Sequence, residues 1–161
     1  MSIETKHIGG RRALRFASVR EVLADAERVA VGAPKTLGNW SPGQIFLHLA
    51  RGIDASIDGV EMKLPWPMRL VGRLARGRIL RGAMRAGINL PPAGADYFNP
   101  GPTTTEAGLA SLRAAILRLE GTSQRAASPL LGRLTAAEWE QFHLRHAELH
   151  LSFIVEGGRH G

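Results

Sequence analysis

Apolar residues recur three or four positions apart along most of the chain, which is the period of one face of an α-helix. The first such stretch covers residues 18–31. Ser18 stands three positions before Glu21, the capping-box spacing typical of a helix start. The turn at 32–39 is rich in glycine, proline and asparagine and ends the stretch. We therefore expect a first amphipathic helix at 18–31.

A second helix is predicted from Ser41 to about Gly59. Ser41 is a suitable N-cap, Pro42 occupies the first helical position, where its missing N–H is not needed, and Gln44 stands at the box position. The apolar positions that follow are Ile45, Leu49, Ile53 and Ile57. The sequence KLPWP at 63–67 then interrupts the pattern.

Two more helices are predicted in the second half of the chain. Thr103 or Thr104 caps one of them, whose apolar positions are Leu109, Leu112, Ile116 and Leu119. The other starts at Thr135, with Glu138 at the capping-box position, and ends at Gly157. Its inward stripe consists of Trp139, Phe142, His146, Leu149 and Phe153.

The stretch between the second and third helices is less regular. Residues 67–85 favour a looser helical segment, and residues 87–102 an irregular connection of a length that often covers a pocket. No stretch alternates with period two over the length of a strand, so we expect essentially no sheet. The chain is thus predicted to be one all-α domain over 1–161, with its core at about 12–155. Its four main helices and one accessory segment form a bundle.

The composition restricts the chemistry that the chain can perform. It is 44% hydrophobic and 22% charged, as in ordinary globular proteins, and it contains no cysteine. Disulfides, thiolate metal sites and cysteine nucleophiles are therefore excluded, and a metal would need His, Asp, Glu or water as ligands. No apolar run reaches the roughly 20 residues of a membrane span, and residues 1–12 lack the apolar core of a signal peptide. We expect a cytoplasmic protein.

The formal net charge is +7, and arginines concentrate in one segment without acidic residues. They are Arg69, Arg73, Arg76, Arg78, Arg81 and Arg85. This segment is either a surface that attracts phosphate, nucleic acid or anionic lipid, or the solvated face of an amphipathic helix. We favour the second interpretation, with Met68, Val71, Leu74 and Met84 facing inward. No aromatic residues alternate with the arginines, so we do not expect nucleic acid as a partner.

Three histidines have the spacing of a metal site. His146 and His150 are four positions apart and share a helix face with apolar residues, which directs both imidazoles inward. Such pairs are often only two half-buried histidines, but imidazoles facing a core need a shared partner. His48 is the third candidate for binding zinc, nickel or iron. His143 is a candidate fourth ligand, an outer neighbour or an aromatic core residue.

Three segments resemble the DinB-like (damage-inducible) superfamily, in a branch of unassigned function. They are NWSPGQIFLHLARGIDASIDG, LPPAGADYF and SPLLGRLTAAEWEQFHLRHAELHLSFI. The likeness extends from about residue 12 to 155. It implies an up-down-down-up four-helix bundle with a metal triad of His48, His146 and His150. The chain departs from the branch at Leu149 and Ser128, where histidines are frequent, and neither position belongs to the triad.

The resemblance implies a divalent-metal-dependent enzyme that acts on a small molecule. Relatives are thiol-dependent transferases and isomerases, or hydrolases, so a low-molecular-weight thiol is an expected substrate. The ion would be zinc, nickel, iron or manganese, and three histidine ligands leave a position open. Gln44, Asp58 and His143 are candidates for orienting or proton-transfer roles, although Asp58 also fits an ordinary carboxylate at a helix end.

A non-catalytic, stress-related bundle that binds a metal or ligand is the alternative. Dimers are common among the relatives, and the apolar residues 90–92 are a candidate contact for a homodimer.

Overall fold

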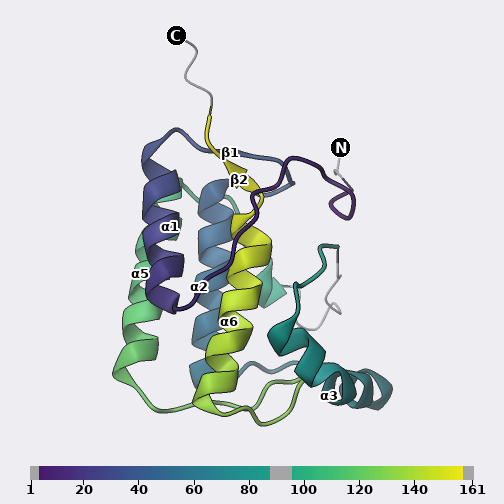
Figure 1. The fold of residues 1–161 in the computed structure, drawn as a ribbon. Coiled ribbons are helices and arrows are strands. Elements are labelled where there is room, and N and C mark those ends of the chain that lie inside the picture. The colour runs from purple at the N-terminus through teal and green to yellow at the C-terminus, as the bar shows by residue number, and fades with distance from the viewer. Residues whose placement is uncertain (1–3, 88–95, 158–161) are drawn as a thin grey trace.

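The computed structural model describes residues 4–87 and 96–157, and it is mostly helical, as the sequence predicts. In Figure 1 its longer helices are α1 (Val19–Val31), α2 (Pro42–Asp58), α3 (Trp66–Arg81), α5 (Thr105–Gly121) and α6 (Ala136–Leu151). Within the described residues, none of the helices is long and apolar enough to cross a membrane. The candidate dimer contact at 90–92 lies outside the described residues.

The predicted helix starts are confirmed at the level of individual hydrogen bonds. Each N-cap side chain accepts a backbone N–H of the first turn, and the four caps are Ser18, Ser41, Thr104 and Thr135. Gln44 and Glu138 complete capping boxes by accepting the N–H of Ser41 and Thr135 at 2.9 Å. Local sequence therefore fixes where these four helices begin.

The end of α6 differs from the prediction. The helix stops at Leu151 instead of continuing to Gly157, and the chain then forms β2 (Ile154–Val155). This strand pairs antiparallel with β1 (Lys35–Thr36), and this short ribbon is a detail that the prediction of essentially no sheet did not include. Strands of two residues are too short to show a period of two. β-Branched residues such as Ile154 and Val155 favour extended backbone, which accounts for the early end of the helix.

Helices α2 and α5 pack so closely that their backbones are in contact. A Cβ atom added to Gly43 would overlap the carbonyls of Thr103 and Thr104, and one added to Gly108 would overlap the backbone of Gly43. These contacts join the N-terminal ends of both helices. At the other ends, Arg118 of α5 pairs with Asp54 and Asp58 of α2. The two helices therefore run parallel.

The remaining two helices run opposite to this pair. Early α2 meets late α6 where His48 contacts His146, and late α2 meets early α6 where Ser56 contacts His143. Helix α1 is antiparallel to α5, since Arg20 pairs with Glu120 and Glu27 with Arg113. The main hydrophobic core lies between α1, α2, α5 and α6.

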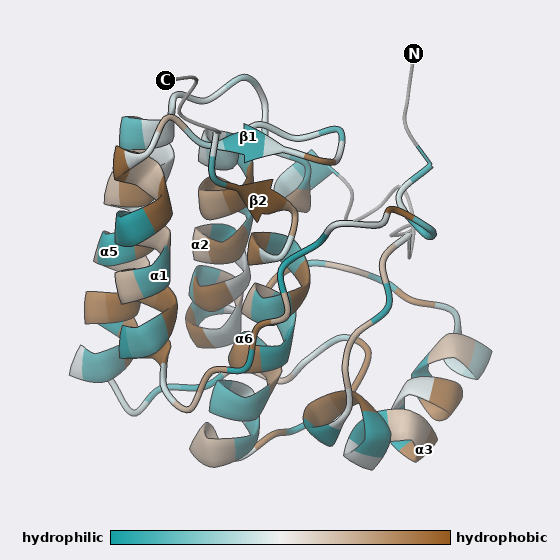
Figure 2. Ribbon diagram, turned by 45° about the horizontal axis from the view of Figure 1, so that its top comes forward, coloured by the Kyte–Doolittle hydropathy of each residue, from teal (hydrophilic) through white to brown (hydrophobic). Residues whose placement is uncertain are grey.

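Helix α3 stands apart from these four helices (Figures 1 and 2). It is held at Gly72, where an added Cβ would lie 2.6 Å from the Leu130 carbonyl oxygen. Leu80 also anchors it, within a small cluster that includes Leu131, Leu134 and Trp139. The predicted inward positions Met68, Val71 and Leu74 are wrong, because all three side chains are exposed.

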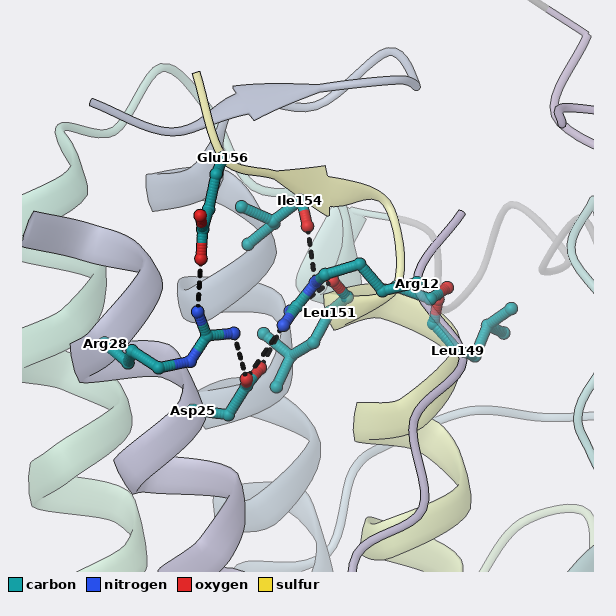
Figure 3. A network of polar contacts seen from close by, with 8 residues as sticks. Arg12, Asp25, Arg28, Leu149, Leu151, Ile154 and Glu156 are labelled. Carbon is teal, nitrogen blue, oxygen red and sulfur yellow. Dashed lines mark hydrogen bonds and ion pairs between the residues drawn. The ribbon is translucent and has the colours of Figure 1, made fainter. Parts of the chain in front are cut away.

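A polar network ties the N-terminal segment to α1 and to the end of α6 (Figure 3). Arg12 donates two hydrogen bonds to the carboxylate of Asp25, at 2.8 and 2.7 Å, and another to the carbonyl of Ile154 at 2.7 Å. Arg28 bridges Asp25 and Glu156. Burial alone would raise the pKa of Asp25, but the bonds from Arg12 and Arg28 lower it below its usual value. The network therefore works through an ionised carboxylate.

We predict that Gly108→Ala lowers the free energy of unfolding by roughly 1–3 kcal/mol, because the new methyl group must separate α2 from α5. Gly121→Ala, on the same helix, is the matched control, since nothing lies within 4 Å of its Cβ position. Urea denaturation followed by circular dichroism measures both variants. Equal stability of the two alanine variants would contradict backbone contact at Gly108.

Candidate metal centre

The structure brings His48 of α2 together with His146 and His150 of α6, as predicted. One nitrogen from each ring lies within 4.8 Å of the other two, a spacing that can hold a metal ion. The Nε2 atoms of His48 and His146 are 3.0 Å apart. His48 is buried and the other two rings are half-buried. The three rings therefore form a compact cluster.

Helix geometry accounts for the convergence of the three rings. His146 and His150 are one turn apart, so their rings lie next to each other on one face of α6, edge to face with centroids 4.6 Å apart. The antiparallel neighbour α2 presents His48 to the same face. Gly52, one turn after His48, lets the His146 ring approach, because a Cβ atom there would already be 3.5 Å from its Nδ1 and Cε1 atoms. A residue larger than alanine at position 52 would displace the ring.

A backbone carbonyl fixes the tautomer of His48. Its Nδ1 atom lies 2.7 Å from the carbonyl oxygen of Phe98. A carbonyl only accepts hydrogen bonds, so Nδ1 carries the proton of the neutral ring. The lone pair is left on Nε2, the atom that faces His146. This arrangement is typical of metal-binding histidines, whose second nitrogen is held by an outer partner.

Burial keeps the three rings neutral. Desolvation lowers the pKa of His48, and it lowers that of His146 and His150 well below the ordinary value. The neighbouring rings lower the last two further, and the positive charge of Arg11 adds to the effect on His150. Neutral imidazole is the form that binds a metal, so the site is in its binding form near pH 7.

Aromatic side chains surround the cluster, and of these only Phe142 was predicted to lie beside a triad histidine. Trp40 stacks on His150 with ring centroids 5.7 Å apart and also contacts His48 at 4.7 Å. Phe98 meets His48 edge-on, and Phe142 packs against His146. The only sequence signal for Trp40 is its place directly before the N-cap Ser41, where an apolar residue often packs against the first turns of the helix.

Three side chains on one face of α2 hold the segment 97–100 by its backbone. Gln44 donates to the carbonyl of Pro100 at 3.0 Å, and Arg51 donates to the carbonyl of Tyr97 at 2.8 Å. His48, between them on this face, binds the Phe98 carbonyl. Gln44 thus has two structural roles, in the capping box and in this segment, and it stands one turn before a triad ligand.

The structure places His143 away from the triad. Its Nε2 atom is 3.0 Å from the Ser56 hydroxyl, which itself donates to the carbonyl of Ile53 at 2.6 Å. Because the hydroxyl proton is already used, His143 donates. The ring is buried and stacked on Trp139. Burial, with a smaller contribution from the charge of Arg125, lowers the pKa of His143 to about 3.

Asp58 lies at the far end of α2. It is ten residues after His48, which is roughly 15 Å along a helix axis at 1.5 Å per residue. Arg118 donates two hydrogen bonds to its carboxylate, both at 2.6 Å, and these lower its pKa. Asp58 therefore joins α2 to α5 through Arg118.

A family model described as a protein of unknown function, DUF1569, matches residues 9–157. The chain belongs to this family. Searches of curated proteins and of solved structures each found no match. The DUF1569 match includes all three histidines of the triad, the aromatic side chains around them and the segment that binds His48.

We predict that stability falls with acid partly through His143. The unfolded chain binds a proton at this residue below about pH 6.5, whereas the folded chain binds one only near pH 3. The titration of His143 therefore leaves the free energy of unfolding unchanged above pH 6.5. Below that, it lowers this free energy by about 1.4 kcal/mol per pH unit as the pH falls toward 3. His143→Gln retains an amide donor for Ser56 and removes the titration. Its unfolding free energy, measured in urea between pH 4 and 7, should fall less steeply than that of the wild type; parallel curves would refute the assignment.

Proposed function

We propose that this DUF1569 protein is a divalent-metal-dependent enzyme of the DinB-like type that acts on a small molecule. The helix directions support the DinB-like arrangement. Helices α2 and α5 run parallel, and α1 and α6 run opposite to them, which corresponds to an up-down-down-up four-helix bundle. The ordered segments shared with the DinB-like superfamily, from about residue 12 to 155, support the same assignment.

The observation that carries the proposal is the 2.7 Å contact between Nδ1 of His48 and the carbonyl oxygen of Phe98. Three neutral imidazoles within 4.8 Å suit zinc, nickel, iron or manganese, and the Phe98 carbonyl orients His48 as a ligand, with the lone pair of Nε2 toward its neighbours. A divalent ion held by three protein ligands supplies a Lewis acid with a position open to water or substrate.

The surroundings of the triad favour a small anionic substrate, such as a thiolate or a carboxylate. Arg11 and Arg51 are close enough for their charges to lower the pKa of His150 and His48, respectively. Trp40 contacts His48 and His150, and Phe98 contacts His48, so aromatic rings form part of the surroundings of the site. A low-molecular-weight thiol remains our expected substrate, because the two arginines would stabilise its ionised form.

We propose positioning roles for two of the three other predicted site residues. Gln44 keeps the segment 97–100 in place over α2, and through it the carbonyl that orients His48. His143 sets the spacing of early α6 and late α2 through Ser56. Asp58 lies too far along α2 to exchange a proton at the triad, so we propose that it acts through Arg118. A homodimer and a cytoplasmic location remain predictions.

We predict about one divalent ion per chain in protein purified without a histidine tag, and loss of that ion in His150→Ala. His143→Gln is the matched control and retains the ion, because its ring nitrogen binds Ser56 and not the metal. Elemental mass spectrometry measures the content after incubation with zinc, nickel or manganese. A wild-type chain that takes up none of these ions would overturn the proposal.

With the metal identified, the loaded protein should catalyse transfer of a low-molecular-weight thiol or hydrolysis of an ester or amide. His150→Ala should reduce turnover at least a hundredfold, since the whole site is lost. Metal binding without turnover on any of these substrates would favour the non-catalytic binding bundle instead.

A further inference from the structure

The outer face of α3 exposes large apolar side chains. Trp66 is 73% exposed, Val71 64% and Leu74 79%, and Leu70 is also exposed. Figure 2 shows apolar and polar residues side by side on this helix, which projects from the other helices. Isolated apolar residues are common on protein surfaces, but a cluster of them on one helix indicates a partner.

These side chains form a stripe with helical spacing. Trp66, Leu70 and Leu74 follow one another at intervals of four, so they lie along a single face. Gly72 lies on the opposite face and Leu80, near the end of the helix, is buried, and through both residues α3 packs on the rest of the protein. The apolar stripe is therefore separate from the packed face, and it points to solvent.

The segment that carries the stripe is rich in positive charge. Between Glu61 and Asp96 the sequence contains no acidic residue but seven basic ones, which are Lys63, Arg69, Arg73, Arg76, Arg78, Arg81 and Arg85. Among the ion pairs of the described residues, Arg76 alone of these seven has a partner, Glu138. Arg78 and Arg81 follow Leu74 at intervals of four and seven, so they continue the outward face.

We propose that α3 is a docking helix for an anionic lipid surface. The apolar stripe enters the boundary between headgroups and acyl chains, and the arginines bind the acidic headgroups. Trp66 at the start of the helix is the side-chain type that membrane interfaces prefer. Figure 1 shows α3 at the end of the molecule away from β1 and β2, where a flat surface can reach it.

The charges argue against the other candidate occupants. A second copy of the chain would bring two sets of arginines together without acidic partners, which opposes self-association through this face. Nucleic acid would use the arginines but leave the apolar stripe in water. A lipid surface that combines acidic headgroups with an apolar interior satisfies both parts of the face. This inference is independent of the metal centre.

Vesicle flotation tests the proposal on the full-length protein. We expect binding to vesicles of phosphatidylcholine with phosphatidylserine, little binding to phosphatidylcholine alone, and weakening with salt. Leu74→Ser should reduce the affinity about tenfold, and Arg78→Gln about fivefold. Leu117→Ser is the matched control, because Leu117 is 60% exposed but lies on α5.

Several results would overturn the inference. One is the absence of binding to acidic vesicles at low salt, and another is an equal effect of Leu74→Ser and Leu117→Ser. Binding to a duplex oligonucleotide but not to vesicles would assign the face to nucleic acid. A dimer in analytical ultracentrifugation that Leu74→Ser dissociates, without vesicle binding, would assign it to a second copy. Circular dichroism of each variant verifies that the helices are intact.

Discussion

The backbone contact between α2 and α5 positions everything around the histidine cluster. Gly43 and Gly108 let the two helices meet without intervening side chains, so α2 is fixed in both height and rotation. A neighbouring side of α2 then carries Gln44, His48 and Arg51, spaced by four and three residues on one helix face. A rotation of α2 would move His48 away from α6 and release the segment that orients its ring.

The cluster itself combines two demands that oppose each other. Half-buried imidazoles must stay neutral to avoid the free-energy cost of a buried charge, and neutral imidazoles still need partners for their nitrogens. The Phe98 carbonyl satisfies one nitrogen of His48, and the Ser56 hydroxyl satisfies one nitrogen of His143. The ring nitrogens of the triad that converge between α2 and α6 have mainly one another as neighbours. A shared cation would give all of them a partner. The family match is compatible with such a site but names no activity.

The sequence predicts features that depend on local chemistry. Caps such as Ser41 and Thr135 need only a few neighbouring residues, and the spacing of His146 and His150 follows from the helix period. The sequence contains no such local pattern for features that depend on backbone atoms far away along the chain. The carbonyl of Phe98 can belong to any residue type, and the two-residue pairing of β1 with β2 has no periodicity. The orientation of α3 was predicted wrongly because apolar residues occur on both of its faces, so periodicity alone did not identify the packed one.

The manner in which α2 holds the segment 97–100 has a consequence for how this family can diversify. Three side chains of α2 bind main-chain carbonyls, which are the same whatever side chains the segment carries. Substitutions at Tyr97, Phe98 or Asn99 can therefore reshape the wall of the histidine cluster without releasing the bond that orients His48. The orientation of His48 is thus independent of the side chains around the cluster. Selection can change those side chains while His48 keeps its orientation.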